Sequence, residues 1–241
     1  LLRTTRETGT LLLKAACRAG QPQRALRMLH DVDGYRLFPT LGGVHYLMIN
    51  FSLRGDTQSV VSAFEALPLR ELVPNARTYH ILVRECVDSG DVPRAAAYQQ
   101  RCMDAGLQPT RVSFNILMNG WRKLNEPGQM LRLREQLDAR GIELNDTTVK
   151  FSVLAHAMAG DMPRAVAEFT RHAERLPDAA HRAAFVAQFL DNNAPAHDEH
   201  AEARAELGAH APPQAPPAAS EHTAASLQLV GEIFDALDAH R

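Results

Sequence analysis

Turn-forming residues recur in this chain every 35 residues, and this period constrains the fold more than any other feature of the sequence. Three prolines, each followed by Thr or Asn, share one phase: Pro39, Pro74 and Pro109. Four glycines and one asparagine share a second phase: Gly20, Gly55, Gly90, Asn125 and Gly160. A fixed period of this size is typical of a solenoid built from stacked supersecondary units.

The period divides the chain into five units of two helices each: 6–40, 41–75, 76–110, 111–145 and 146–180. In 76–110 most of the apolar residues of Thr78–Val87 fall on one helical face. Ser89-Gly90-Asp91 ends that helix, and Pro93 suits the first turn of a second helix that extends to Asp104. The pattern predicts at least nine helices within 6–178 and no strands.

One position of the second helix carries a small or apolar residue in every unit, which favours close helix packing. Its occupants are Ala25, Val60, Ala95, Met130 and Ala165.

Two segments carry a resemblance to a known family. Residues 112–121 (VSFNILMNGW) are similar to the first-helix pattern of the pentatricopeptide repeat family, and 140–145 (RGIELN) to its repeat end. The resemblance covers about residues 6–178. It implies an all-α, right-handed α-solenoid of about five 35-residue helix-turn-helix repeats. The tetratricopeptide alternative has a 34-residue period and a signature that is missing here.

The resemblance also implies an RNA-contacting face, on which each repeat reads one nucleotide. In the family, the fifth and last residues of a repeat face the base, and the second residue packs between bases. The fifth residues here are Thr10, His45, His80, Asn115 and Lys150. The last residues are Thr40, Asn75, Thr110 and Asn145. The second residues are Glu7, Gly42, Arg77, Val112 and Thr147.

Asn115 with Asn145 is the combination that matches the family, where it is associated with pyrimidines. The candidate phosphate contacts are Arg77, Arg111, Arg122 and Lys123. The alternative for all of these residues is a solvated face without a base partner, on which the cations are ordinary exposed helix charges.

Charge is distributed unevenly along the chain. Residues 1–180 hold 23 Lys and Arg against 19 Asp and Glu, a net charge of +4, whereas 181–241 hold 3 against 9, a net charge of −6. No stretch is long and apolar enough for a membrane span. The cysteines Cys17, Cys86 and Cys102 have no paired spacing, which predicts buried thiols rather than disulfides.

The last quarter of the chain departs from the repeat pattern. We expect an additional helix in 181–193, an Ala- and Pro-rich linker in 194–220 and an amphipathic helix in 221–241. His197 and His200 lie in the linker without a recognisable metal-binding pattern. No phosphate-binding loop or nucleophile motif occurs, so we expect no cofactor, no small-molecule substrate and no enzyme activity.

These features predict a non-catalytic, RNA-contacting scaffold subunit of an organellar ribonucleoprotein, with the mitochondrial ribosome as the first candidate. Its partners would be RNA and other protein subunits. The organelle is implied by the family, with the plastid as the alternative to the mitochondrion. Two other functions stay open: a free-standing RNA-processing or stability factor, and a protein-interaction solenoid without RNA.

Overall fold

The computed structural model describes residues 5–34, 37–176 and 181, and these residues form helices without a strand. Contacts group them into two compact units, with the boundary between Ser113 and Phe114. The expected elements in 181–193, 194–220 and 221–241 lie outside the described residues, apart from His181. The right-handed winding of the solenoid stays a prediction.

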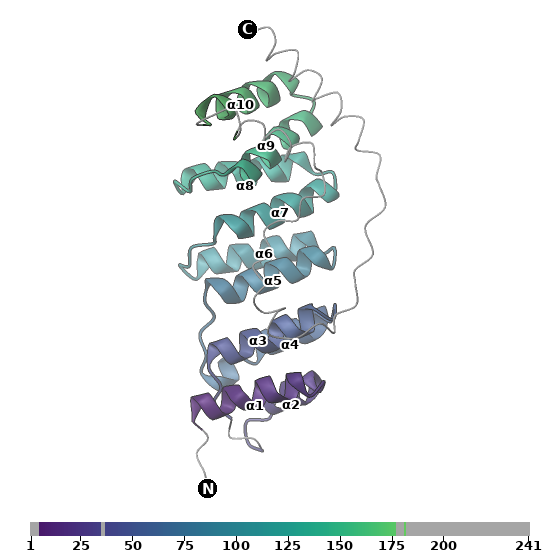
Figure 1. Cartoon of the computed structure of the whole chain (residues 1–241), viewed down its shortest axis with the longest axis vertical. Coiled ribbons are helices and arrows are strands. Elements are labelled where there is room, and N and C mark those ends of the chain that lie inside the picture. Colours follow the sequence, from purple (N-terminus) through teal and green to yellow (C-terminus); the bar gives the residue numbers. More distant parts are fainter. Residues whose placement is uncertain (1–4, 35–36, 177–180, 182–241) are drawn as a thin grey trace. The chain divides into compact units, whose positions relative to one another are not determined.

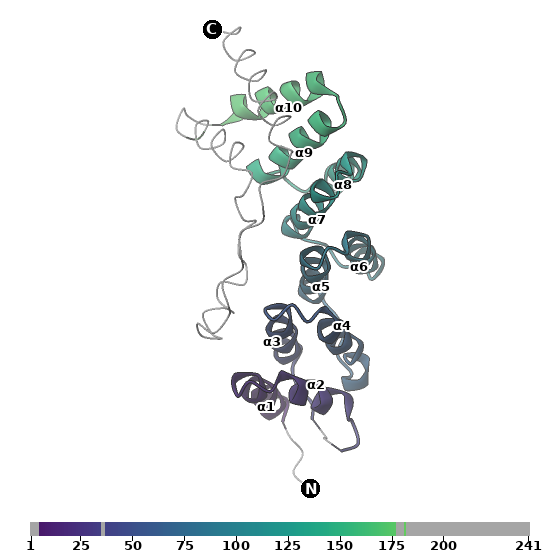
Figure 2. The same cartoon turned by 90° about the vertical axis from the view of Figure 1, so that its right-hand side faces the viewer.

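The first compact unit contains three helical pairs and the first residues of α7 (Arg111–Lys123), and its helices are labelled in Figure 1. Its helices are α1 (Arg6–Arg18), α2 (Pro22–His30), α3 (Leu41–Ser52), α4 (Thr57–Glu65), the short 3₁₀ helix η1 (Pro68–Arg70), α5 (Ala76–Asp88) and α6 (Val92–Asp104). The helices α1, α3 and α5 lie along one side of this unit, and α2, α4 and α6 lie along the other (Figure 2). Within the unit, α3 packs against both α1 and α5.

The second compact unit continues the same plan. Its helices are α7 (Arg111–Lys123), which begins before the boundary, α8 (Pro127–Ala139), α9 (Asp146–Met158) and α10 (Met162–Arg175). The helix α9 packs against both α8 and α10. The described residues therefore contain ten α-helices, consistent with the sequence prediction of at least nine.

The turns between paired helices lie at the predicted residues. Gly20, Gly55, Gly90 and Gly160 have φ between +69° and +87°, and Asn125 has φ of +57°. This left-handed conformation suits Gly best and Asn next best among the amino acids. Asp56, Asp91 and Asp161 then cap the second helices of their repeats.

Stacking buries the apolar residues that the period aligns. Ala25, Val60, Ala95, Met130 and Ala165, which share one slot of the second helix, are all 0% exposed. The three cysteine thiols are free and buried, as predicted, and burial raises the pKa of Cys17 and Cys86 to about 11. None of the helices in the described part is long and apolar enough to span a membrane.

The first helix shows what stacking contributes. Leu11 and Leu12 of α1 are 65% and 41% exposed, whereas Tyr46 and Leu47, one period later, are 6% and 0% exposed. The apolar positions are the same in α1 and α3. Of these two helices, only α3 packs against the first helices of two neighbouring repeats, α1 and α5, within this unit. Burial at these positions therefore comes from the neighbouring repeat.

The repeat 41–75 departs from the pattern by inserting η1, which holds a buried arginine. The Arg70 guanidinium donates to the carbonyl oxygens of Leu29 and Leu37 at 2.8 Å each, and of Met28 at 2.6 Å and Asp31 at 3.0 Å. Several of these carbonyls belong to the end of α2, where the helix leaves its last carbonyls unpaired. Arg70 thus joins the first repeat to the second.

Two glycines of the first compact unit provide a matched test of the turn conformation. An added Cβ at Gly90 would meet no atom within 4 Å, and at Gly42 its nearest neighbour would be Thr40 Oγ1 at 3.7 Å. Because Gly90 alone of the pair has positive φ, we predict that Gly90→Ala lowers the free energy of unfolding by roughly 1 kcal/mol. Gly42→Ala should raise it by up to about 0.5 kcal/mol, because alanine favours a helix. Urea unfolding measures both, and equal effects would contradict the turn assignment.

Candidate nucleic-acid interface

The last residue of each of the first four repeats caps the first helix of the next one. Its side-chain oxygen accepts the backbone N–H three residues further on, which has no partner inside its own helix. The bonds run from Gly43 N–H to Thr40 Oγ1 (3.2 Å), Thr78 N–H to Asn75 Oδ1 (3.1 Å), Ser113 N–H to Thr110 Oγ1 (3.3 Å) and Thr148 N–H to Asn145 Oδ1 (3.0 Å). Asn75 and Thr110 are exposed, and Thr40 and Asn145 are half-buried, so these predicted base-facing side chains are accessible.

The fifth residues lie deeper, and three of them contact the third residue of the following repeat. His45 Nε2 lies 2.8 Å from Thr78 Oγ1, and His80 Nδ1 lies 3.2 Å from Ser113 Oγ. Asn115 Oδ1 accepts a hydrogen bond of 2.9 Å from Thr148 Oγ1. In each pair the two residues are 33 positions apart. Because the contact recurs at three repeat boundaries, it is a feature of the repeat and not of one position in the chain.

Burial keeps the two imidazoles neutral. Burial, with a smaller contribution from the nearby Arg77 charge, lowers the pKa of His45 to about 4. Burial likewise lowers the pKa of His80 to about 4, with additional contributions from Arg84 and Arg77. At neutral pH both rings therefore act as hydrogen-bonding groups and not as cations that attract phosphate.

The second repeat lacks the third-residue hydroxyl, so the fifth residue of the first repeat, Thr10, has no such partner. Gly43 occupies that position, and its Cβ, if present, would lie 3.0 Å from side-chain atoms of Thr10. Thr10 Oγ1 instead contacts Thr40 Oγ1 directly at 2.8 Å and accepts the Thr40 N–H at 2.9 Å. At the other end of the repeats, Lys150 is buried in α9. The fifth position thus has a different environment in the first repeat than in the three that follow.

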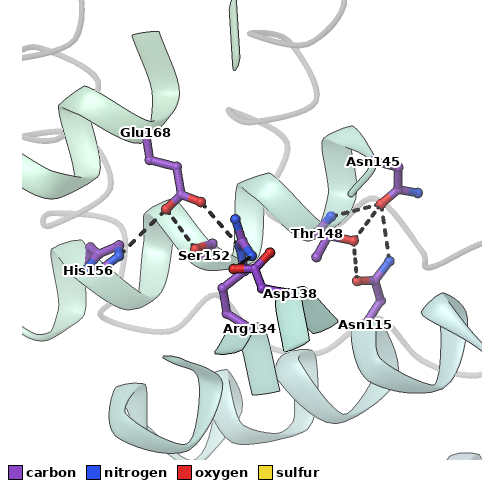
Figure 3. Close-up of polar contacts among 8 residues, drawn as sticks. All are labelled: Asn115, Arg134, Asp138, Asn145, Thr148, Ser152, His156 and Glu168. Carbon is purple, nitrogen blue, oxygen red and sulfur yellow. Dashed lines mark hydrogen bonds and ion pairs between the residues drawn. The ribbon is translucent and has the colours of Figure 1, made fainter. Parts of the chain in front are cut away.

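Asn115 and Asn145, the pair that matches the family, meet in the second compact unit (Figure 3). Asn115 Nδ2 faces Asn145 Oδ1 at 3.5 Å. Thr148 lies beside both, because its hydroxyl is 2.7 Å from Asn145 Oδ1 and 2.9 Å from Asn115 Oδ1. The structure therefore brings together the two residues that the sequence singles out, and it adds a third.

A second polar cluster fixes α9, the helix that carries Thr148 (Figure 3). Glu168 of α10 accepts a 2.7 Å hydrogen bond from Ser152 Oγ and lies 3.4 Å from Arg134 Nε of α8. His156 Nε2 is 3.6 Å from the same carboxylate. A half-buried carboxylate shared among three helices restricts their relative movement. Arg134 also pairs with Asp138.

The second residues form a more accessible group than the fifth residues. Glu7, Gly42 and Arg77 are exposed, and Val112 and Thr147 are half-buried. Val112 is the apolar member of this set, which suits a contact with the face of a base. Whether these side chains pack between bases stays a prediction.

The four candidate phosphate contacts differ in their environments. Arg77 is exposed, and its charge acts on both His45 and His80. Arg111 is half-buried at the start of α7. Arg122 and Lys123 end α7, so Lys123 lies about 12 Å along the axis from Asn115 at 1.5 Å per residue. Arg122 is held by Asn119, whose Oδ1 accepts from its Nε and a terminal nitrogen at 3.2 and 3.0 Å, and burial lowers the pKa of Arg122.

The residues missed at the sequence level are the hydroxyl-bearing third residues, Thr78, Ser113 and Thr148. The 35-residue period already aligns them, but Ser and Thr near a helix start are explained by capping preference alone. No group of three or more His, Cys, Asp or Glu among the described residues is arranged to hold a metal ion. His197 and His200 lie outside the part of the chain that the structure describes.

Paired helices repeated every 35 residues define a helical-repeat α-solenoid. By sequence, residues 64–122 match the pentatricopeptide repeat domain. No significant relative is found among curated proteins. The chain thus contains a segment that matches the pentatricopeptide repeat domain, and the period and the helical pairs of the described residues agree with that match.

The fold is similar to those of solved proteins of low sequence identity. PPR10 of maize, solved in complex with an 18-nt psaJ RNA element, has a TM-score of 0.55 and 20% identity over 76% of this chain and 27% of PPR10. A cysteine-substituted PPR10 in complex with RNA has a TM-score of 0.54 and 21% identity, over 69% of this chain and 24% of that protein. Nuclear proteinaceous RNase P 2 of A. thaliana has a TM-score of 0.61 and 12% identity, over 78% of this chain and 42% of that protein. The chain thus spans less than half the length of each of these proteins.

Proposed function

We propose that this chain binds single-stranded RNA through the capping and fifth residues of its repeats and has no catalytic role of its own. The observation that carries the proposal is the meeting of Asn115 with Asn145, one amide half-buried at a helix start and the other directly behind it. An amide can both donate and accept, so this pair can hydrogen-bond to the Watson–Crick edge of a base. Similarity to PPR10, which was solved with RNA, supports this use of the fold.

Base selection in this proposal depends on neutral hydrogen bonds more than on charge. His45 and His80 are uncharged at neutral pH, and Arg122 is engaged by Asn119. Residues 1–180 carry a net charge of +4 over five repeats. Few phosphates are then neutralised, so the logarithmic salt dependence of RNA affinity should have a shallow slope, on the order of −1 to −3.

We extend this proposal to a role as a scaffolding subunit in a larger complex. Five repeats address about five nucleotides, which is too short a sequence for unique recognition by this chain alone. We therefore infer a scaffolding subunit of an organellar ribonucleoprotein, held by RNA together with other protein subunits, with the mitochondrial ribosome as its location. The net charge of −6 in 181–241 repels phosphate and suits a contact with a basic protein.

The base-reading proposal predicts a loss of affinity at one position. Asn115→Ala should weaken binding of a preferred short RNA by roughly 5- to 150-fold, the scale of one good base contact. Asn119→Ala is the matched control, because Asn119 lies one turn further along α7 and contacts Arg122. Fluorescence anisotropy at fixed salt measures both affinities. Wild-type protein that binds no RNA, or equal losses in the two variants, would contradict the proposal.

The scaffolding role predicts which RNA and proteins co-purify with the chain from cells. The tagged full chain should sediment with mitochondrial ribosomal RNA and proteins, and deletion of 181–241 should weaken this association without lowering affinity for short RNA. Recovery of a single messenger RNA would instead favour a free-standing factor. Recovery of proteins without RNA would favour a protein-interaction solenoid.

A further inference from the structure

The hydroxyl at the third position of a repeat touches two groups at once. In α5, Thr78 Oγ1 lies 3.2 Å from Asn75 Oδ1 and 2.8 Å from His45 Nε2. In α7, Ser113 Oγ lies 3.1 Å from Thr110 Oγ1 and 3.2 Å from His80 Nδ1. Both hydroxyl-bearing side chains are buried, Thr78 at 0% and Ser113 at 4% exposed. Each hydroxyl therefore links the capping residue of a repeat boundary to the fifth residue of the preceding repeat.

We infer that these third residues, Thr78, Ser113 and Thr148, are positioning residues that select which hydrogen-bonding group the preceding repeat presents to a base. The inference rests on the proposed RNA-binding function. It makes the specificity of one repeat depend on a side chain of the next. The three residues would not touch RNA themselves.

The geometry at Thr148 shows how the selection operates. When the Thr148 hydroxyl donates to Asn115 Oδ1, that oxygen is occupied on the protein side and the amide N–H groups are turned toward Asn145. Asn115 then offers a donor to the base. Without the hydroxyl, only the 3.5 Å contact with Asn145 Oδ1 opposes a 180° turn of the amide about its last side-chain torsion, which exchanges donor and acceptor. The expected result is a loss of discrimination between bases rather than a loss of binding.

The same contact selects between the two forms of a histidine ring when the hydroxyl proton is used elsewhere. The Thr78 hydroxyl donates to Asn75 Oδ1 and therefore accepts from Nε2–H of His45. A neutral imidazole has one nitrogen that donates and one that accepts, and a hydrogen bond at one nitrogen fixes the role of the other. Thr78 contacts Nε2 of His45, whereas Ser113 contacts Nδ1 of His80. Two repeats with the same fifth residue thus turn different ring nitrogens toward the hydroxyl.

The first repeat provides a natural comparison. Gly43, at the third position of the second repeat, has no side chain, and Thr10 contacts the capping residue Thr40 directly. A threonine hydroxyl rotates to donate or accept and needs no external group to set its orientation. The positioning hydroxyl is found beside His45, His80 and Asn115. Each of these fifth residues has one group that donates a hydrogen bond and a different group that accepts one.

The test replaces the hydroxyl while keeping the shape of the side chain. Thr148→Val removes it and Thr148→Ser retains it, and both keep the backbone N–H that Asn145 accepts. Affinities of the full chain are measured for four RNA oligonucleotides that differ in the base at one position. Thr148→Val should reduce the ratio between the best and worst base by roughly 3- to 10-fold, the effect of one hydrogen bond. Affinity for the best base should change little, and Thr148→Ser should retain the wild-type ratio.

A second measurement separates this inference from the function on which it rests. The side-chain amide signals of Asn115 in the free protein, observed by NMR, should shift or broaden in Thr148→Val and stay close to wild type in Thr148→Ser. Failure of the wild-type protein to bind RNA would contradict the proposed function. The amide signals would still show whether Thr148 orients the Asn115 amide, because they are measured without RNA. An unchanged base ratio together with unchanged amide signals in Thr148→Val would overturn the inference. If Thr148→Val fails to fold, Ser113→Ala and Ser113→Thr provide the same comparison through the ring signals of His80.

Discussion

The side-chain cap at each repeat boundary is the interaction on which the rest of this structure depends. The last residue of a repeat accepts the N–H of the third residue of the next, as Asn75 does for Thr78 and Asn145 for Thr148. This bond ends one repeat and fixes where the next helix starts. At the three later boundaries the capped residue also contacts the preceding fifth residue. Helix initiation and the candidate RNA interface are therefore built from one set of atoms.

This arrangement has a consequence for how such a chain can change its specificity. A fifth residue such as Asn115 is buried and hydrogen-bonded within the protein before any RNA arrives. Preorganisation of this kind limits the entropy that binding costs and makes the orientation of the amide matter more than its mere presence. Under the proposed function, the reading of a base within each compact unit would depend on pairs of repeats instead of single ones.

Much of the fold could be predicted because the period records backbone requirements. Gly90 and Asn125 occupy positive-φ turns for which few other residues are suited, and the slot of Ala25 is buried in every repeat. The insertion of η1 could not be predicted, because Arg70 acts only through carbonyl groups that folding brings together. At the interface, the meeting of Asn115 with Asn145 follows from the family pattern. The deep position of His45 and the role of Thr78 depend on packing between repeats, which one sequence does not display.

The central claim is that RNA contacts the starts of the first helices. Ultraviolet cross-linking of the full chain to a short uridine-rich RNA, followed by mass-spectrometric mapping of the linked peptides, tests this most directly. The account predicts cross-links within residues 75–80 and 110–115 and at Asn145, and none in α4, α6 or α8. Cross-links confined to those second helices, or to 181–241, would contradict it.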